Sequence, residues 1–240
     1  PTTAYAKAGA AVRDPETGER LALFDPAARA QGVFIDPAVA LTAPASLARS
    51  ASLNAFAMAV ESSLANTADP LADGLLAHAL ALLAGWLPRL PAAPDDPEVR
   101  MYLMLAALVS GQGTDYVGGG LAQALAHAVG PRSGVANGVI EAILLPHAIR
   151  FAGIEEPERL TKVARAIDPR TDPVDSADDL AAFVARTLAG LGVPARLRDV
   201  GVDRGVLADA AAHAMDDWAL GQAPRPPTET EVVRLLEDAW

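Results

Sequence analysis

The feature that most constrains this chain is a change of pattern near residue 46. From there to the C-terminus, alanine and leucine recur at helical spacing, in long stretches separated by clusters of Pro, Gly and Asp. Apolar side chains at this spacing form one face of a helix, and that face has to be buried against other helices. The stretches predict helices at about 46–65, 69–88, 98–110, 121–129, 133–150, 157–167, 176–191, 203–218 and 228–239. The predicted fold class is therefore all-α, a helical bundle.

The first 45 residues follow a different pattern. Short β-prone pieces, such as residues 33–35, lie between Asp-Pro pairs, and Gly18 is the expected tip of a hairpin. We therefore predict two parts. Residues 1–45 form an extended arm with short β pieces, and residues 46–240 form the helical domain.

Composition and charge exclude several classes of protein. The chain has 30 acidic and 19 basic side chains and a net charge of -11, which argues against a nucleic-acid partner. It contains no cysteine, so disulfides and Cys-ligated metals are excluded. The most apolar run, residues 75–87, is shorter than the roughly 20 residues that span a bilayer. We expect no membrane segment, no signal peptide and a cytoplasmic location.

Several short motifs occur in a characteristic order. They are Pro-Thr-Thr-Ala at 1–4, Phe-Ile-Asp-Pro at 34–37, Leu-Asn-Ala at 53–55, Ala-His-Ala-Val-Gly at 126–130 and Leu-Leu-Pro-His at 144–147. This order resembles the iron-containing alcohol dehydrogenase superfamily, and the Asn-Ala pair and the C-terminal Leu-Leu-Glu-Asp-Ala-Trp are most similar to the maleylacetate reductases. The resemblance implies a dehydroquinate synthase-like α-domain that supplies the metal and substrate groups, beside an N-terminal α/β domain that binds NAD(P)H.

The resemblance also implies where the cofactor would lie. Thr2 and Thr3 match the segment that touches the nicotinamide end of NAD(P)H, provided that an N-terminal nucleotide-binding domain or subunit is present. The glycine-rich pyrophosphate loop is missing from this sequence, so we expect no cofactor to bind to the chain alone. Tyr5 and Lys7 replace the usual glycine and serine. We expect them in a solvated arm, with projection into the cleft as the alternative.

The metal site of the family consists of an Asp or Asn and three His. In this sequence the four positions are Asn54, Met58, Gln123 and Asn137. Neutral amides and a thioether are poor ligands for Fe²⁺ and Zn²⁺, so we expect no Fe, no Zn and no other metal. The three amides are predicted to form a hydrogen-bonded cluster around the former metal cavity. With Met58, they are the candidate residues for binding a small polar or acidic organic molecule.

Two histidines belong to the candidate site. His127 stands one helical turn after Gln123 and is the candidate catalytic residue, because an imidazole can protonate or polarise a carbonyl oxygen. A structural role is the equal alternative. His147 matches the wall of the family's cleft and is counted with the substrate-binding residues, with packing as the alternative.

Three acidic or glycine-rich features receive structural interpretations. Glu61 is expected to be a buried acid paired with an Arg. The acidic pair 216–217 is expected in an exposed turn or at a helix start. The triple glycine at 118–120 lacks the form of a phosphate-binding loop, and it predicts a tight entry that lets the next helix approach the cavity.

Three functions remain open. The first is the substrate domain of a maleylacetate reductase-type, NAD(P)H-dependent oxidoreductase that has lost its metal site. The second is a standalone, metal-independent, non-redox enzyme of the isomerase, dehydratase or cyclase type, which we favour for turnover by this chain alone. The third is a non-catalytic binding or assembly module. A homodimer is compatible with each of them.

Overall fold

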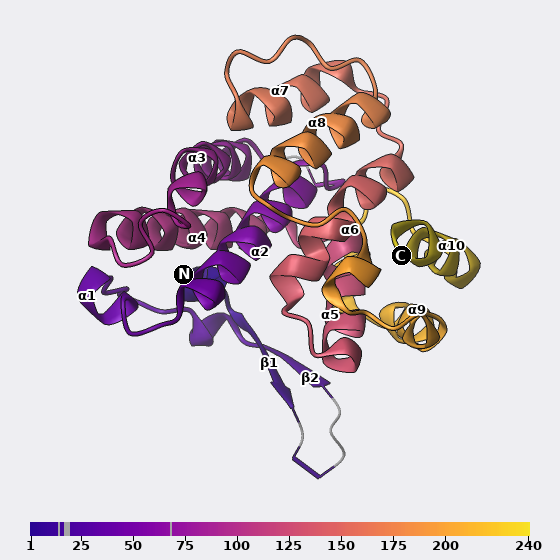
Figure 1. The fold of residues 1–240 in the computed structure, drawn as a ribbon, viewed down its shortest axis with the longest axis horizontal. Coiled ribbons are helices and arrows are strands. Elements are labelled where there is room, and N and C mark those ends of the chain that lie inside the picture. Colours follow the sequence, from indigo (N-terminus) through magenta and orange to yellow (C-terminus); the bar gives the residue numbers. More distant parts are fainter. Residues whose placement is uncertain (14, 17–19, 68) are drawn as a thin grey trace.

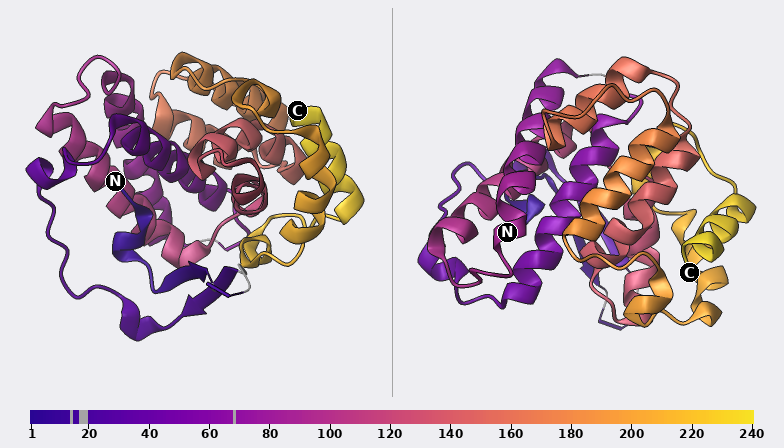
Figure 2. Two further views of the ribbon diagram at one scale, coloured as in Figure 1. Left: turned by 60° about the horizontal axis from the view of Figure 1, so that its bottom comes forward. Right: turned by 45° about the horizontal axis from the view of Figure 1, so that its top comes forward.

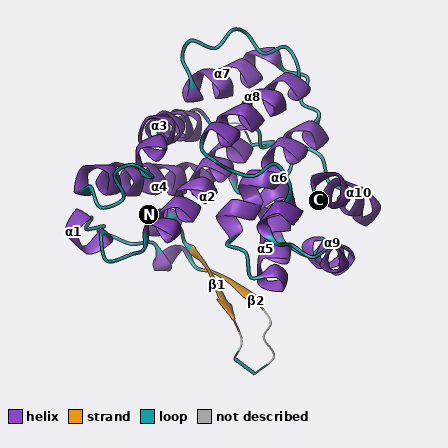
Figure 3. Ribbon diagram, viewed as in Figure 1, coloured by secondary structure: helices purple, strands orange, loops and turns teal. Residues whose placement is uncertain are grey.

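The computed structural model describes residues 1–240 except 14, 17–19 and 68. Helices pack around one another in a bundle, and a single β-hairpin projects from its lower side (Figure 1). Most of the rest of the described chain lies in loops and short turns of 3₁₀ helix (Figure 3). The all-α prediction is confirmed.

The longer helices are α2 (Ala45–Ser63), α3 (Pro70–Trp86), α4 (Pro97–Val117), α5 (Leu121–Ser133), α6 (Asn137–Ala152), α7 (Pro157–Ile167), α8 (Ala177–Gly190), α9 (Leu207–Ala214) and α10 (Glu229–Ala239). Helix α2 runs through the middle and packs against α3, α4, α5 and α6. Two further views show α9 and α10 covering the side of the bundle formed by α5 and α6 (Figure 2). Alanine-rich faces allow these close helix contacts.

Local capping explains most helix starts. Asp69 and Asp96 accept backbone N–H groups of the next turn and are each followed by Pro, and Ser176 accepts the backbone N–H of Asp179. The last helix, α10, begins with a capping box, in which Thr228 and Glu231 satisfy each other's backbone N–H.

Some predicted boundaries were wrong. Helix α4 continues to Val117 instead of ending near residue 110, and α5 continues through Pro131 to Ser133. Gly134 has a φ of 72°, which ends α5, and α6 begins at Asn137, four residues after the predicted start at 133. Helix α9 covers only eight residues of the predicted 203–218.

The N-terminal arm contains the hairpin. Strand β1 (Gly9–Arg13) pairs antiparallel with β2 (Arg20–Phe24), with Gly9 opposite Phe24. Residues 33–35 lie in neither strand nor helix, contrary to their β-prone pattern, and the short helix α1 (Pro37–Ala40) interrupts the predicted extended arm. The predicted hairpin tip, Gly18, lies outside the described residues.

One helical stretch of the described chain, Pro70–Arg89, has the length and mean hydropathy of a membrane span. The sequence interpretation had counted only its shorter apolar run. In the structure, α3 packs against α2, α4 and α7. This position identifies it as a helix of the bundle.

Candidate functional site

A cavity of about 780 Å³ lies between the N-terminal segment and helices α2, α4, α5 and α6. It brings together most of the predicted site residues. Those that line it are Thr3, Asn54, Met58, Gln123, His127 and Asn137. The four positions that correspond to the family's metal ligands therefore lie around one space, although they come from three helices.

Helical periodicity and small residues produce this arrangement. Asn54 and Met58 are one turn apart on α2, as Gln123 and His127 are on α5. Helix α6 comes close to α2 because residue 138 is glycine, and a Cβ atom there would overlap the carbonyl oxygen of Ser50.

The amide side chains have separate hydrogen-bond partners. Asn54 Nδ2 donates to Glu141 Oε2, and Gln123 Nε2 donates to Met58 Sδ at 3.7 Å. Within the described part of the chain, no hydrogen bond joins Asn54, Gln123 and Asn137 to one another, so the predicted amide cluster was wrong. Gln123 Oε1 is buried and has no hydrogen-bond partner. This oxygen lies against Gly119, where a Cβ atom would be only 1.7 Å from it.

The residues present do not fit a catalytic Fe²⁺ or Zn²⁺. Met58 Sδ accepts hydrogen bonds from Gln123 and from Thr3 Oγ1, and Asn54 is held by Glu141. A thioether and neutral amides are weak donors for these ions. Among the residues that the structure describes, no three His, Cys, Asp or Glu side chains are grouped in a way that could hold a metal.

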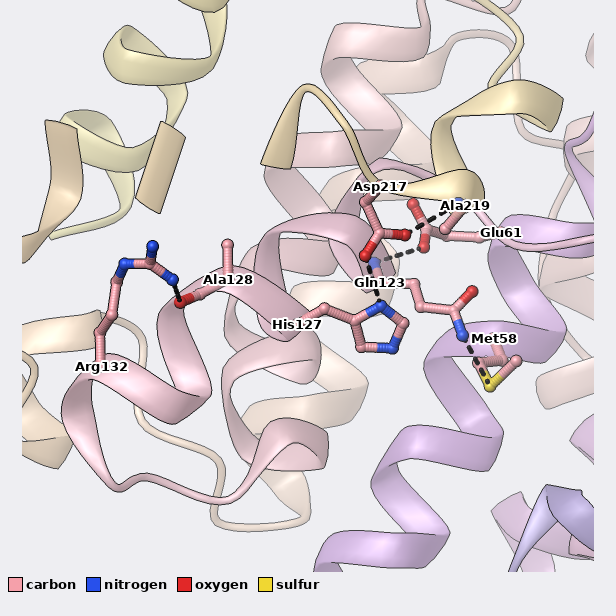
Figure 4. A network of polar contacts seen from close by, with 8 residues as sticks. All are labelled: Met58, Glu61, Gln123, His127, Ala128, Arg132, Asp217 and Ala219. Carbon is pink, nitrogen blue, oxygen red and sulfur yellow. Dashed lines mark hydrogen bonds and ion pairs between the residues drawn. The ribbon is translucent and has the colours of Figure 1, made fainter. Parts of the chain in front are cut away.

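His127 is held by an acidic residue from a distant part of the chain. Its Nδ1 lies 2.8 Å from Asp217 Oδ2, and the two side chains are only 11% and 13% exposed (Figure 4). The other carboxylate oxygen of Asp217 accepts the backbone N–H of Ala219 at 2.8 Å. With the carboxylate as acceptor, the Nδ1 of a neutral imidazole carries the proton and Nε2 keeps its lone pair. Asp217 is the N-cap of the 3₁₀ turn η6 (Trp218–Gln222), which confirms the predicted helix start, whereas the alternative of an exposed turn was wrong.

Glu61 is a buried acid, as predicted, but its partners are backbone groups (Figure 4). Its carboxylate accepts the N–H of Ala122 at 2.8 Å and of Gln123 at 3.1 Å, at the positive end of α5. Burial nevertheless raises the pKa of Glu61 to about 7, because desolvation outweighs these hydrogen bonds. The predicted Arg partner was therefore wrong. A Cβ atom at Gly120 would lie 2.6 Å from the Glu61 carboxyl, which confirms the predicted tight entry to α5.

Two charged residues were missed or misplaced by the sequence interpretation. Lys7 lines the cavity and is only partly exposed, so it does not lie in a solvated arm. Glu141 is 1% exposed and stands one turn after Asn137 on α6. Its sequence signal was available, since it is a lone carboxylate within the apolar stretch from Ile140 to Leu145.

The structure separates two candidate residues from the cavity lining. His147 is not among the lining residues, and burial together with the charges of Arg150 and Arg196 lowers its pKa. Thr2 caps the first 3₁₀ turn, η1 (Thr3–Ala6), by accepting the N–H of Ala4 at 3.2 Å.

Comparisons with known proteins agree with this architecture. Residues 48–240 match the family model described as "Fe-containing alcohol dehydrogenase family, C-terminal". Lactaldehyde reductase from Escherichia coli strain K12 is 30% identical over an alignment that covers 100% of this chain and 64% of the relative. Maleylacetate reductase from Sphingobium indicum is 28% identical, covering 86% and 56%. The alcohol dehydrogenase from Oenococcus oeni has the same fold, with a TM-score of 0.90 at 24% identity, covering 100% and 64%.

The fold and the matched residues thus define an all-α domain of the kind found in the C-terminal part of such dehydrogenases. The chain belongs to the Fe-containing alcohol dehydrogenase family, as its motifs predicted. It spans 56–64% of the length of the relatives named above.

Proposed function

We propose that this chain is the substrate-binding part of an NAD(P)H-dependent oxidoreductase that acts on a small polar or acidic organic molecule without a divalent metal. The observation that carries the proposal is the cavity itself. It lies where the family pattern places the metal, and its lining includes amides, a thioether and His127. NAD(P)H, held by an N-terminal nucleotide-binding domain or subunit, supplies the hydride. A cytoplasmic location is part of the proposal.

Each nearby side chain has a role that follows from its position. In its imidazolium form His127 donates its second ring proton to the substrate oxygen, while Asp217 accepts from Nδ1 and fixes the ring beside the cavity. Thr3 lies at the same cavity and belongs to the segment that the family pattern assigns to the nicotinamide end. Asn54, Gln123 and Asn137 orient a polar substrate through their amide groups.

The His127–Asp217 pair also favours a second candidate. A histidine held by a carboxylate can move a proton with no cofactor, which suits a non-redox isomerase, dehydratase or cyclase. This candidate predicts proton exchange at a substrate carbon without any change in NADH.

The test uses the natural gene product, purified in the presence of a chelator. We expect oxidation of NADH or NADPH with an aldehyde or keto acid, for which lactaldehyde and maleylacetate are the first probes. His127→Gln is expected to lower kcat by about 100-fold, in the range typical of lost acid–base catalysis. His213→Gln is the matched control, because His213 is exposed on α9.

The outcomes separate the candidates. Deuterium exchange into a substrate from D₂O, without NAD(P)H oxidation, would support the non-redox enzyme. Loss of all activity only after removal of a bound metal would overturn the metal-free proposal. If His127→Gln leaves every activity of the protein unchanged, the cavity belongs to a binding or assembly module.

A further inference from the structure

Lys7 is a cation inside the candidate site. It follows η1 and lines the cavity together with Asn54, Met58 and Gln123. Burial lowers its pKa to about 8, even though the charges of Glu141 and Asp115 act in the opposite direction. At neutral pH the side chain is therefore mostly an ammonium, with three N–H donors beside the cavity.

A buried carboxyl group stands behind the cavity wall. Glu141 does not line the cavity, but its Oε2 accepts a hydrogen bond from Asn54 Nδ2 and its Oε1 has no partner. Burial raises the pKa of Glu141 well above its usual range, and the charge of Glu61 adds to this effect. The hydrogen bond from Asn54 and the charge of Lys7 act against it. The positive charge of Lys7 thus partly compensates for the buried carboxyl group of Glu141, because it lowers the pKa of that group.

The other charged groups near the cavity are already paired. Asp115 on α4 forms an ion pair with Arg29 at 2.7 Å and accepts the backbone N–H of Ala8 at 3.3 Å. Across the cavity, Asp217 is paired with His127. Within the described chain, no carboxylate oxygen forms an ion pair with Lys7 at 4.0 Å or less. Its donors are therefore available to a ligand.

The free donors of Lys7 define the chemistry of the ligand. An ammonium binds an oxygen acceptor, and a carboxylate or a carbonyl group supplies one. Gln123 Oε1 is not available for such a contact, because it is buried and lies against Gly119.

We propose that Lys7 is the oxygen-binding group of this cavity, where the family pattern has a divalent cation, and that the ligand is a small carboxylate or carbonyl compound. The ammonium binds and polarises the ligand oxygen. This inference rests on the proposed function for the identity of the site. It does not depend on hydride transfer, so the two can fail separately.

The binding experiment uses the fact that the chain has only two lysines, Lys7 and Lys162. In the natural protein labelled with ¹³Cε-lysine, Lys162→Arg identifies the Lys7 resonance. Glycolate is the probe, and its neutral amide is the matched control that lacks the charge. We expect glycolate to shift the Lys7 resonance and to bind more tightly than the amide.

Two variants test the assignment by calorimetry. Lys7→Met keeps an apolar stem without the charge, and we expect it to weaken glycolate binding about tenfold or more, as loss of a charge-assisted hydrogen bond requires. Lys162→Met, on the surface helix α7, is expected to leave binding unchanged.

Several results would overturn the inference. One is equal glycolate affinity in Lys7→Met, and another is the absence of any glycolate effect on the Lys7 resonance. A third is a covalent adduct on Lys7 after borohydride treatment with a carbonyl ligand, because it would identify a neutral amine nucleophile. NAD(P)H oxidation is assayed separately, so its absence in a protein that binds glycolate through Lys7 would count only against the proposed oxidoreductase.

Discussion

The buried carboxyl group of Glu61 gives the sharpest test of the electrostatics of this domain. Two opposing effects act on it. The N-terminus of α5 stabilises the carboxylate through the N–H groups of Ala122 and Gln123, and burial destabilises it. Burial dominates, because the pKa rises from 4.5 to about 7.

The sign of the effect on stability follows from proton binding. Between these two pKa values the folded state holds a proton on Glu61 and the unfolded state does not, so folding takes up a proton. The contribution of Glu61 to the free energy of unfolding is therefore fully present below pH 4.5 and falls as the pH rises to about 7. At ~1.36 kcal/mol for each pH unit, the total loss is about 3 kcal/mol.

Urea unfolding of the wild type and of Glu61→Gln at pH 5, 6, 7 and 8 measures this loss. Gln does not titrate, so its altered hydrogen bonds change the free energy of unfolding by the same amount at every pH. We expect the stability of the variant relative to the wild type to increase by about 2–3 kcal/mol from pH 5 to pH 8. Glu158→Gln, at an exposed position in α7, controls for a general effect of charge. A difference between Glu61→Gln and the wild type that stays constant within about 0.5 kcal/mol would refute the reasoning, because it would mean that the helix N-terminus compensates for burial.

Three further predictions concern packing, catalysis and metal content. Gly138→Ala is expected to lower the free energy of unfolding by about 1–3 kcal/mol, because its Cβ would overlap Ser50. Gly74→Ala is the control, because there is open space around Gly74 in α3, and it is expected to raise the free energy of unfolding by about 0.5–1 kcal/mol. Equal effects of the two substitutions would contradict the close contact of α2 and α6. Asp217→Asn is expected to reduce kcat about tenfold or more and to change its pH profile by altering the orientation and tautomer of His127, whereas a purely structural role would change thermal stability alone. Elemental analysis of the active protein is expected to show far less than one Fe or Zn per chain, and a stoichiometric metal that is required for activity would contradict the donor chemistry described above.

The sequence was sufficient for the class of fold and for much of the cavity wall. Periodic apolar residues and capping signals specified the helices, since both are local properties. The ordered motifs identified the family, and their spacing selected Asn54, Met58, Gln123 and Asn137, which line one cavity. Helix ends were less accurate, because contacts and backbone geometry at single glycines such as Gly134 decide them.

By itself, the amino-acid sequence determined that this protein is a cysteine-free bundle of helices, with amides and a thioether at the positions where the family resemblance implies metal ligands. Only the tertiary structure decided the electrostatics of the site. It paired His127 with Asp217, held Glu61 against the N-terminus of α5, and placed Lys7 at the cavity with Glu141 behind its wall. Local pattern does not specify these relationships, because both the partner and the desolvation of a charged group depend on which distant segments pack around it.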